Sequence, residues 1–200
     1  MTQTRPQPLL FSLQNLVVSL AFVNRNHLLI GSNRAENDIE HSFAVAMLCW
    51  YIHDTHKLNL NLEKILKYAL AHDFVEVYAG DVNTFASPEA RKKKVEIEKV
   101  AAARLSKEYE EFADLISTLD GYEAKSDEEA LFVWTVDKMQ ALILGDLDDW
   151  RPYKQLAISY ARFIEKYDEL QAVSSPYCKE IFASLMTYCQ TTYYDRPQDS

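Results

Sequence analysis

Apolar residues recur every three or four positions along most of the chain, which is the spacing of an amphipathic helix. Phe43, Ala46, Met47 and Trp50 show this spacing, and several later segments repeat it. The alternation of apolar and polar residues that marks a half-buried strand is missing. The pattern therefore predicts an all-α fold, a single-domain helical bundle. The predicted helices span roughly 8–24, 38–56, 62–78, 89–106, 108–120, 126–147, 151–171 and 176–192.

Residues that favour the start of a helix stand before several of these segments. Ser126, with Glu129 three residues later, has the form of a capping box before the sixth segment. In Ser175-Pro176 the proline suits the first turn of the last helix. The candidate caps are Asn37 or Asp38, Asn61, Ser87, Ser126 and Ser175.

Length and composition favour one domain. The chain has 200 residues, of which 48% are hydrophobic and only four are glycine. This is enough to bury one good core, and no repeat or Gly/Ser linker divides the chain. We expect a single domain over 1–200, with a catalytic core at about 25–150, C-terminal helices at about 151–192 and a frayed tail at 193–200.

Charge and hydropathy argue against several classes of partner. The formal net charge of −9 repels nucleic-acid backbones, so we expect no nucleic-acid partner. The basic run 91-RKKK-94 is followed by the acidic 95-VEIEK-99, and we interpret it as a solvated helix face. No apolar run reaches the ~20 residues that span a bilayer, so we expect no membrane partner and a cytoplasmic protein. Three cysteines in apolar surroundings are interpreted as reduced core residues; they are Cys49, Cys178 and Cys189.

The segment 70-LAHDFVEVYAGD-81 reads as a packed helix but carries four ionisable groups. At helical spacing His72, Asp73 and Glu76 point toward one broad face. An imidazole and a carboxylate can hold a divalent ion, while a further carboxylate can manage the proton of a water molecule. The His-Asp dipeptide alone is equally explained by a hydrogen bond at a helix end, and the same dipeptide occurs a second time in the chain.

Two more ionisable residues are predicted to face the core. His41 stands near the start of the second helix with apolar neighbours on its side, and taken alone it reads as a hydrogen-bonded structural residue. Asp137 is a single carboxylate within the apolar stripe 131-LFVWTVDKMQALIL-144. A cation is expected to meet it, because an unpaired buried charge is costly. Two histidines and two aspartates form a hard-to-borderline donor set that suits Mn, Fe, Co, Ni or Zn.

The order His41, then His72-Asp73, then Asp137, spread over several helices, resembles the HD-domain metal-dependent phosphohydrolases. More narrowly, R-x-E-N-x-x-E-H-S, H-D-x-x-E-x-x-x-G-D and V-D-K/A-x-x-A-L resemble motifs of the bacterial 5'-deoxynucleotidases and their eukaryotic HD-containing protein 2 relatives. The resemblance covers about residues 25–144. It implies an HD-type helical domain, a metal-dependent phosphomonoesterase acting on (deoxy)nucleoside 5'-monophosphates in nucleotide metabolism, and a homodimer.

The resemblance also implies roles for the residues of the metal centre. It makes His41, His72, Asp73 and Asp137 the ligands of a divalent transition metal. Glu76, one turn after the His-Asp pair, would orient or deprotonate the attacking water. Asp73 and Glu76 are therefore the expected catalytic residues.

The substrate contacts follow from the same resemblance. Asp81, after the helix-ending glycine, would lie at the substrate edge and contact the sugar. Arg25 is the nearest candidate for the arginine that contacts the phosphate, and Arg34 and Lys138 are further candidates. A local positive field is needed, because a chain of net charge −9 otherwise repels an anionic substrate.

Two departures from the resemblance leave the substrate open. The related deoxynucleotidases carry a tryptophan after the upstream arginine, where this chain has Asn26-His27. They continue the Gly-Asp with a Pro-Thr-Pro turn, where this chain has 82-VNTFASPEA-90. Deoxy versus ribo preference, base and native metal therefore stay open. Two other hypotheses remain: an HD hydrolase of another phosphoester, such as a signalling nucleotide, and a helical interaction module that binds no metal.

Overall fold

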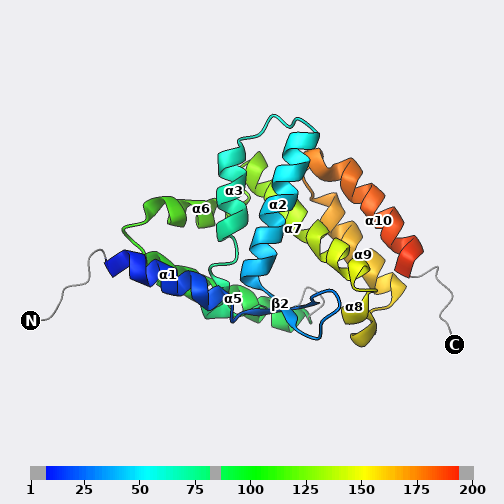
Figure 1. Ribbon diagram of the computed structural model, residues 1–200, viewed down its shortest axis with the longest axis horizontal. Helices are drawn as coiled ribbons and strands as arrows, with labels where there is room; N and C mark the ends of the chain where they lie inside the picture. The colour runs from blue at the N-terminus through cyan, green and yellow to red at the C-terminus, as the bar shows by residue number, and fades with distance from the viewer. Residues whose placement is uncertain (1–7, 82–86, 194–200) are drawn as a thin grey trace, which may run out of the picture.

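The computed structural model describes residues 8–81 and 87–193, and the all-α prediction is confirmed. Figure 1 shows α2, α3 and α7 at the centre, with α1, α5 and α6 on one side and α8 to α10 on the other. The helices are α1 (Pro8–Leu20), α2 (Asp38–Thr55), α3 (Leu62–Ala71), α4 (Glu76–Ala79), α5 (Pro88–Glu108), α6 (Ala113–Ala124), α7 (Glu128–Leu147), α8 (Arg151–Gln155), α9 (Tyr160–Ala172) and α10 (Lys179–Tyr193). A short 3-10 helix, Pro176–Cys178, precedes α10.

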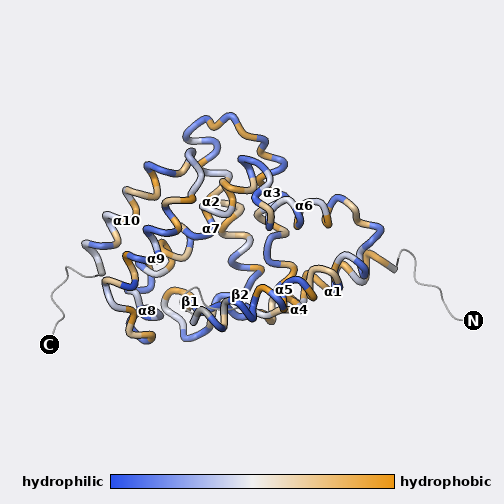
Figure 2. Tube along the Cα trace, turned by 180° about the vertical axis from the view of Figure 1, so that it is seen from behind, coloured by the Kyte–Doolittle hydropathy of each residue, from blue (hydrophilic) through white to orange (hydrophobic). Residues whose placement is uncertain are grey.

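The main core lies where α2, α3 and α7 pack together, with α9 and α10 covering α7. Val45, Phe132 and Val136 have no exposed surface. The prediction for the three cysteines is confirmed, since all are buried and free. In Figure 2 most helices carry hydrophobic and hydrophilic residues in turn, as expected for helices with one buried face. Within the described chain no helix is long and apolar enough to cross a membrane.

The caps place the helix starts close to their predicted positions. Asn37 caps α2 with a complete capping box, because the Asn37 side chain accepts from the Glu40 backbone N–H and the Glu40 side chain accepts from the Asn37 backbone N–H. Asn61 and Ser87 cap α3 and α5 as predicted. The cap of α7 is Asp127 rather than the predicted Ser126. The start of α2 is thus fixed by local hydrogen bonds.

A small antiparallel hairpin interrupts the helical pattern, and the sequence did not predict it. Strand β1 (Asn24–Leu28) pairs with β2 (Ala35–Asn37), so the helix predicted to reach residue 24 ends at Leu20. These strands are too short, and too poor in β-branched residues, to show a strand pattern. The hairpin leads directly into α2 and brings β1 beside the start of that helix.

Two predicted helices are broken in the structure. The segment predicted as 62–78 stops at Ala71 and resumes as α4, with a tight turn between them. Backbone hydrogen bonds between residues three apart, as in a 3-10 helix, hold this turn, including one from the Glu76 N–H to the Asp73 carbonyl. The segment predicted as 151–171 divides into α8 and α9 around Ala157, whose φ is +48°. Apolar spacing continues through both turns, which is why the pattern did not reveal the breaks.

The spacing that predicted α2 does not mark its buried face. Phe43, Met47 and Trp50 are 63%, 46% and 49% exposed, whereas Val45 and Cys49 have no exposed surface. Because α2 is apolar on more than one side, packing against α3 and α7 decided which side turned inward. The buried side carries His41.

Candidate metal centre

The four predicted ligands come from three parts of the chain and converge at one point. His41 lies in the first turn of α2, His72 and Asp73 in the turn between α3 and α4, and Asp137 in the middle of α7. His41 Nε2 lies 3.1 Å from Asp137 Oδ1, 3.3 Å from His72 Nε2 and 3.6 Å from Asp73 Oδ2. Donor atoms of His41, His72 and Asp73 lie within 4.8 Å of one another, which suits a single ion, and Asp137 joins this group through its contact with His41.

A hydrogen bond on the far side of the His72 imidazole turns its Nε2 atom inward. His72 Nδ1 lies 2.9 Å from the carbonyl oxygen of Ala69, which can only accept, so Nδ1 carries the proton and Nε2 keeps a lone pair. His41 Nδ1 lies 3.7 Å from Glu36 Oε2, beyond hydrogen-bond distance, and Gln140 Nε2 donates to Glu36 Oε1 at 2.9 Å. Carboxylates this close together are stabilised by positive charge, which Arg25 and Lys138 supply in part and a bound ion would complete. The residues present therefore fit a divalent metal ion.

The electrostatics of the cluster also favour a cation. Burial and the charge of Arg25 lower the pKa of His41, but the neighbouring carboxylates of Asp137 and Glu36 outweigh them and raise it to about 9. Burial raises the pKa of Asp137, yet Lys138 and His41 hold it well below its usual value. Asp73 behaves in the same way, because neighbouring cations outweigh its burial and lower its pKa. Both carboxylates thus stay ionised beside the imidazoles.

Glu76 opens α4 one turn after Asp73 and is 7% exposed. Its Oε1 accepts a hydrogen bond from Lys94 Nζ at 3.2 Å, while Oε2 is buried and accepts none from the described residues. Burial and the charge of Asp73 raise the pKa of Glu76 to about 8. A carboxyl group with a pKa near neutrality can take up and release a proton near pH 7.

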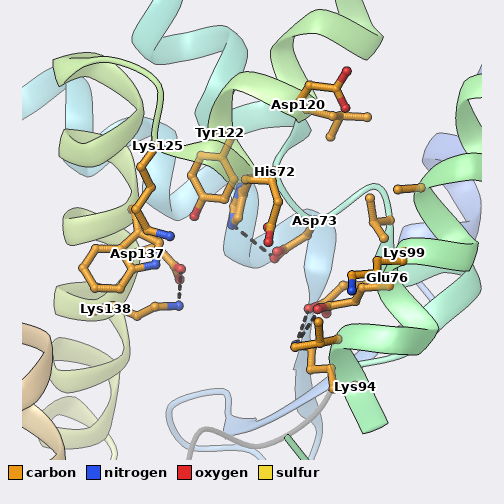
Figure 3. Close-up of a pocket in the computed structure, with 17 residues that line it drawn as sticks. His72, Asp73, Glu76, Lys94, Lys99, Asp120, Tyr122, Lys125, Asp137 and Lys138 are labelled. Atoms are coloured by element: carbon orange, nitrogen blue, oxygen red, sulfur yellow. Dashed lines mark hydrogen bonds and ion pairs between the residues drawn. The ribbon is translucent and has the colours of Figure 1, made fainter. Parts of the chain in front are cut away.

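The cluster borders a pocket of about 350 Å³. Figure 3 shows His72 and Asp73 between two walls, each of which carries lysines. They are Lys94 and Lys99 on the wall of α5, and Lys125 and Lys138 on the opposite wall. Trp134, on α7, also lines the pocket, and the ammonium groups of Lys125 and Lys138 lie 5.1 and 5.8 Å from its ring centroid. The pocket therefore combines lysines and an aromatic face with carboxylates, which are Asp73, Glu76, Glu98, Asp120, Glu123 and Asp137.

Comparison with known proteins places this arrangement in a family. A family model described as HD domain matches residues 17–180. The chain belongs to the HD-domain family. A predicted metal-dependent phosphohydrolase from Magnetospirillum magnetotacticum MS-1 has a similar structure, with a TM-score of 0.76, 24% identity and coverage of 92% of this chain and 95% of that chain. A conserved hypothetical protein from Pyrococcus furiosus has a TM-score of 0.62, 19% identity and coverage of 88% and 99%. No curated protein sequence matches the chain.

Two of the four residues expected at the substrate contact the metal cluster of this HD domain, and a third is bound to the neighbour of one of them. Arg25 Nη1 donates to Asp73 Oδ2 at 2.8 Å, and Lys138 Nζ donates to Asp137 Oδ2 at 2.6 Å. Asn26, the residue after Arg25, donates a hydrogen bond from Nδ2 to Asp81 Oδ2 at 3.3 Å.

Arg34, the fourth, is not brought to the site. Its guanidinium pairs with both carboxylate oxygens of Glu40, at 2.9 and 2.6 Å, and its side chain is 54% exposed. It does not line the pocket and instead supports the capping box of α2.

Several residues of the HD-domain site were not anticipated. The prediction of a solvated face for the run 91–94 holds for Lys92 and Lys93, which are exposed, but is wrong for Lys94. Tyr122 is also missed; its ring centroid lies 5.2 Å from that of His72. No local signal distinguishes these residues, because α5 and α6 are brought to the pocket only by tertiary packing. The segment 82–86 of the expected substrate loop lies outside the described residues.

Proposed function

We propose that this HD domain is a metal-dependent phosphomonoesterase that hydrolyses (deoxy)nucleoside 5'-monophosphates to nucleoside and phosphate. The observation that carries the proposal is the convergence of two imidazoles and two carboxylates at a lysine-lined pocket, with the buried Glu76 one turn away. The family and the similar fold of a protein described as a predicted metal-dependent phosphohydrolase support the reaction class. The nucleotide substrate is our own inference from the pocket and from the motifs.

In this proposal His41, His72, Asp73 and Asp137 hold one divalent transition ion. The mixed nitrogen and oxygen donors suit Mn, Co, Fe, Ni or Zn. When bound, such an ion lowers the pKa of a water ligand and draws charge from the phosphoryl oxygens.

The protein's own residues supply proton transfer and binding of the anion. Glu76 accepts the proton of the attacking water, and its ion pair with Lys94 holds the carboxylate at the pocket wall. Arg25 and Lys138 already lie within 2.8 Å of the carboxylates of the cluster, so they are placed to bind a phosphoryl group that arrives there. Asp81, held by Asn26, is proposed to contact the sugar.

The aromatic wall of the pocket supports a nucleotide over a simpler phosphoester. Trp134 lies one helical turn before Asp137, and cations approach its ring within the pocket. A nucleobase stacked on an aromatic side chain gains about 1–3 kcal/mol, which corresponds to roughly 5- to 150-fold in affinity.

Trp134→Leu is therefore expected to raise KM for a deoxynucleoside 5'-monophosphate by about 5-fold or more, with kcat little changed. KM for 2-deoxyribose 5-phosphate, which lacks the base, should not rise. Trp134→Phe, which keeps an aromatic ring, should keep KM for the nucleotide close to that of the native protein. The matched control is Trp50→Leu, which replaces a half-exposed tryptophan of α2 outside the pocket. An equal increase in KM for both substrates would show that Trp134 only supports the fold.

The function itself is tested by phosphate release from a panel of deoxy- and ribonucleoside 5'-monophosphates. We expect EDTA to abolish release, and Mn²⁺ or Co²⁺, added after the chelator is removed, to restore it. If no compound of the panel releases phosphate although metal is bound, other phosphoesters, such as signalling nucleotides, become the candidate substrates. If Mn²⁺ fails to raise the melting temperature of the metal-depleted protein, the proposed centre is wrong and the interaction module is favoured.

A further inference from the structure

Tyr122, in the last turn of α6, lies against the metal centre although it is not one of the proposed ligands. Its ring centroid lies 5.2 Å from that of His72 and 6.3 Å from that of Tyr68, and both ring pairs are tilted. The side chain also lines the pocket that borders the ligands. The four-donor cluster consists of the proposed ligands His41, His72, Asp73 and Asp137. Packing of α6 on α3 and α7 therefore fixes the Tyr122 ring at the edge of this cluster.

The hydroxyl group of Tyr122 points into the pocket. Figure 3 shows it on the side of the ring that faces Asp137 and the interior of the pocket. Burial and the charges of Asp137 and Asp73 raise the pKa of this phenol well above its usual value, so it keeps its proton. No residue in the described parts of the chain forms a hydrogen bond with this hydroxyl. The neighbouring hydroxyl of Tyr68, by contrast, donates to Asp127 Oδ2 at 2.8 Å. Tyr122 thus presents an unused donor to the site.

This donor differs from the cations that contact the cluster. Arg25 Nη1 donates to Asp73 Oδ2 at 2.8 Å, and Lys138 Nζ donates to Asp137 Oδ2 at 2.6 Å. Each cation must therefore share its charge between a carboxylate and an arriving anion. The Tyr122 hydroxyl only exchanges a water molecule for the anion, so no internal hydrogen bond is lost on binding. Hydrogen bonds to a charged acceptor are also stronger than those to a neutral one.

We propose that Tyr122 is a further substrate-binding residue, whose hydroxyl donates a hydrogen bond to a phosphoryl oxygen of the bound phosphomonoester. The inference rests on the proposed function, because it takes the phosphoryl group to bind at the four-donor cluster. Donors then reach this group from three elements, Arg25 from β1, Lys138 from α7 and Tyr122 from α6. A donor that is fixed before the substrate arrives stabilises the charge of the transition state without reorganisation.

Tyr122→Phe tests the inference, because it removes the hydroxyl and keeps the ring that packs on His72. The probe is inorganic phosphate, titrated into the Mn²⁺-loaded full chain and followed by ³¹P NMR relaxation. We expect the Kd of phosphate to rise about 10-fold or more, since a hydrogen bond to a charged group contributes roughly 10- to 150-fold to an equilibrium constant. kcat/KM for a deoxynucleoside 5'-monophosphate should fall by a similar factor. The affinity for Mn²⁺ should not change.

The matched control is Tyr68→Phe, which removes the same atom from the neighbouring tyrosine. The hydroxyl of Tyr68 is bonded to Asp127, and Tyr68 does not line the pocket. Tyr68→Phe should therefore lower the melting temperature, because an internal hydrogen bond is lost, and leave the Kd of phosphate unchanged.

The possible outcomes separate this inference from the proposed function. An unchanged Kd of phosphate in Tyr122→Phe would overturn the inference while the proposed function stands. Equal increases in Kd in both variants, or weaker Mn²⁺ binding in Tyr122→Phe, would also overturn it, because Tyr122 would then act through the fold or through His72. If the native protein binds Mn²⁺ but no phosphate, the inference and the proposed function are both wrong. If it binds phosphate but hydrolyses no nucleotide, the proposed substrate is wrong, and the Kd of phosphate in the two variants still decides the inference.

Discussion

Replacing Asp73 with alanine is expected to abolish phosphate release while helix content stays unchanged. Loss of an outer hydrogen-bond partner of a metal ligand costs about 10–100-fold, and loss of a ligand should exceed this, so we expect a decrease of at least ~10³-fold. Asp73 Oδ2 lies 3.2 Å from His72 Nε2 and 3.6 Å from His41 Nε2, so no other carboxylate can take its place without movement of the backbone. Activity with added Mn²⁺ and the far-ultraviolet circular dichroism spectrum measure the two effects.

The fold is expected to survive this change. Arg25, which contacts Asp73, keeps its ion pairs with Asp38 and Glu36. The increase in melting temperature on adding Mn²⁺ should fall sharply, because that increase reports ion binding. The control is Asp54→Ala in the chain's other His-Asp dipeptide; its side chain is 69% exposed, so stability should change by less than ~0.5 kcal/mol. Full activity in Asp73→Ala would refute the assignment of this residue.

Glu76→Gln is expected to separate proton transfer from metal binding. Removal of a general acid or base lowers kcat by about 10²–10⁴-fold, and we expect a loss in this range with little change in KM. The four-donor cluster does not include Glu76, so it should still bind its ion. Glutamine keeps the size of the side chain and can still contact Lys94, but it cannot accept a proton. Steady-state kinetics and a count of bound Mn²⁺ measure both properties on one preparation.

The control for this prediction is Glu98→Gln. Glu98 also lines the pocket and also pairs with Lys94, at the same 3.2 Å separation as Glu76. It therefore reports the effect of removing one negative charge next to Lys94. We expect Glu98→Gln to keep kcat within about threefold, less than the loss from a catalytic carboxylate. Equal losses in the two variants would show that Glu76 acts only through the local charge.

The residues proposed as ligands stand out in the sequence because their chemistry is unusual for their positions. Asp137 stands out as one charge within an apolar helix, and the structure places it against His41 and Lys138. The His72-Asp73 pair stands out less, since the chain contains the dipeptide twice. Only the order of all four residues along the helices made the prediction specific. Each signal depends on residue type and helical spacing, which are local properties.

The substrate contacts were harder to predict. They depend on where the tip of a long side chain lies in the folded protein, and the position of the residue in the sequence does not show this. Arg25 and Arg34 both precede His41, but the hairpin directs Arg25 to Asp73 and leaves Arg34 with Glu40. Lys94 differs from the two lysines before it only through its contact with Glu76. The short strands of the hairpin and the packing of α5 give no periodic signal.

The sequence by itself determined that this chain is helical and where most helices lie, because helical spacing is visible along one segment, and the order of its motifs pointed to the four proposed ligands. Tertiary structure decided the rest. It broke the helix after Ala71 so that His72 and Asp73 turn toward α2 and α7. It also brought Asp38 beside Asp73 and formed the pocket from α5, α6 and α7. These outcomes depend on contacts between residues far apart in the chain, and such contacts exist only once the core has packed.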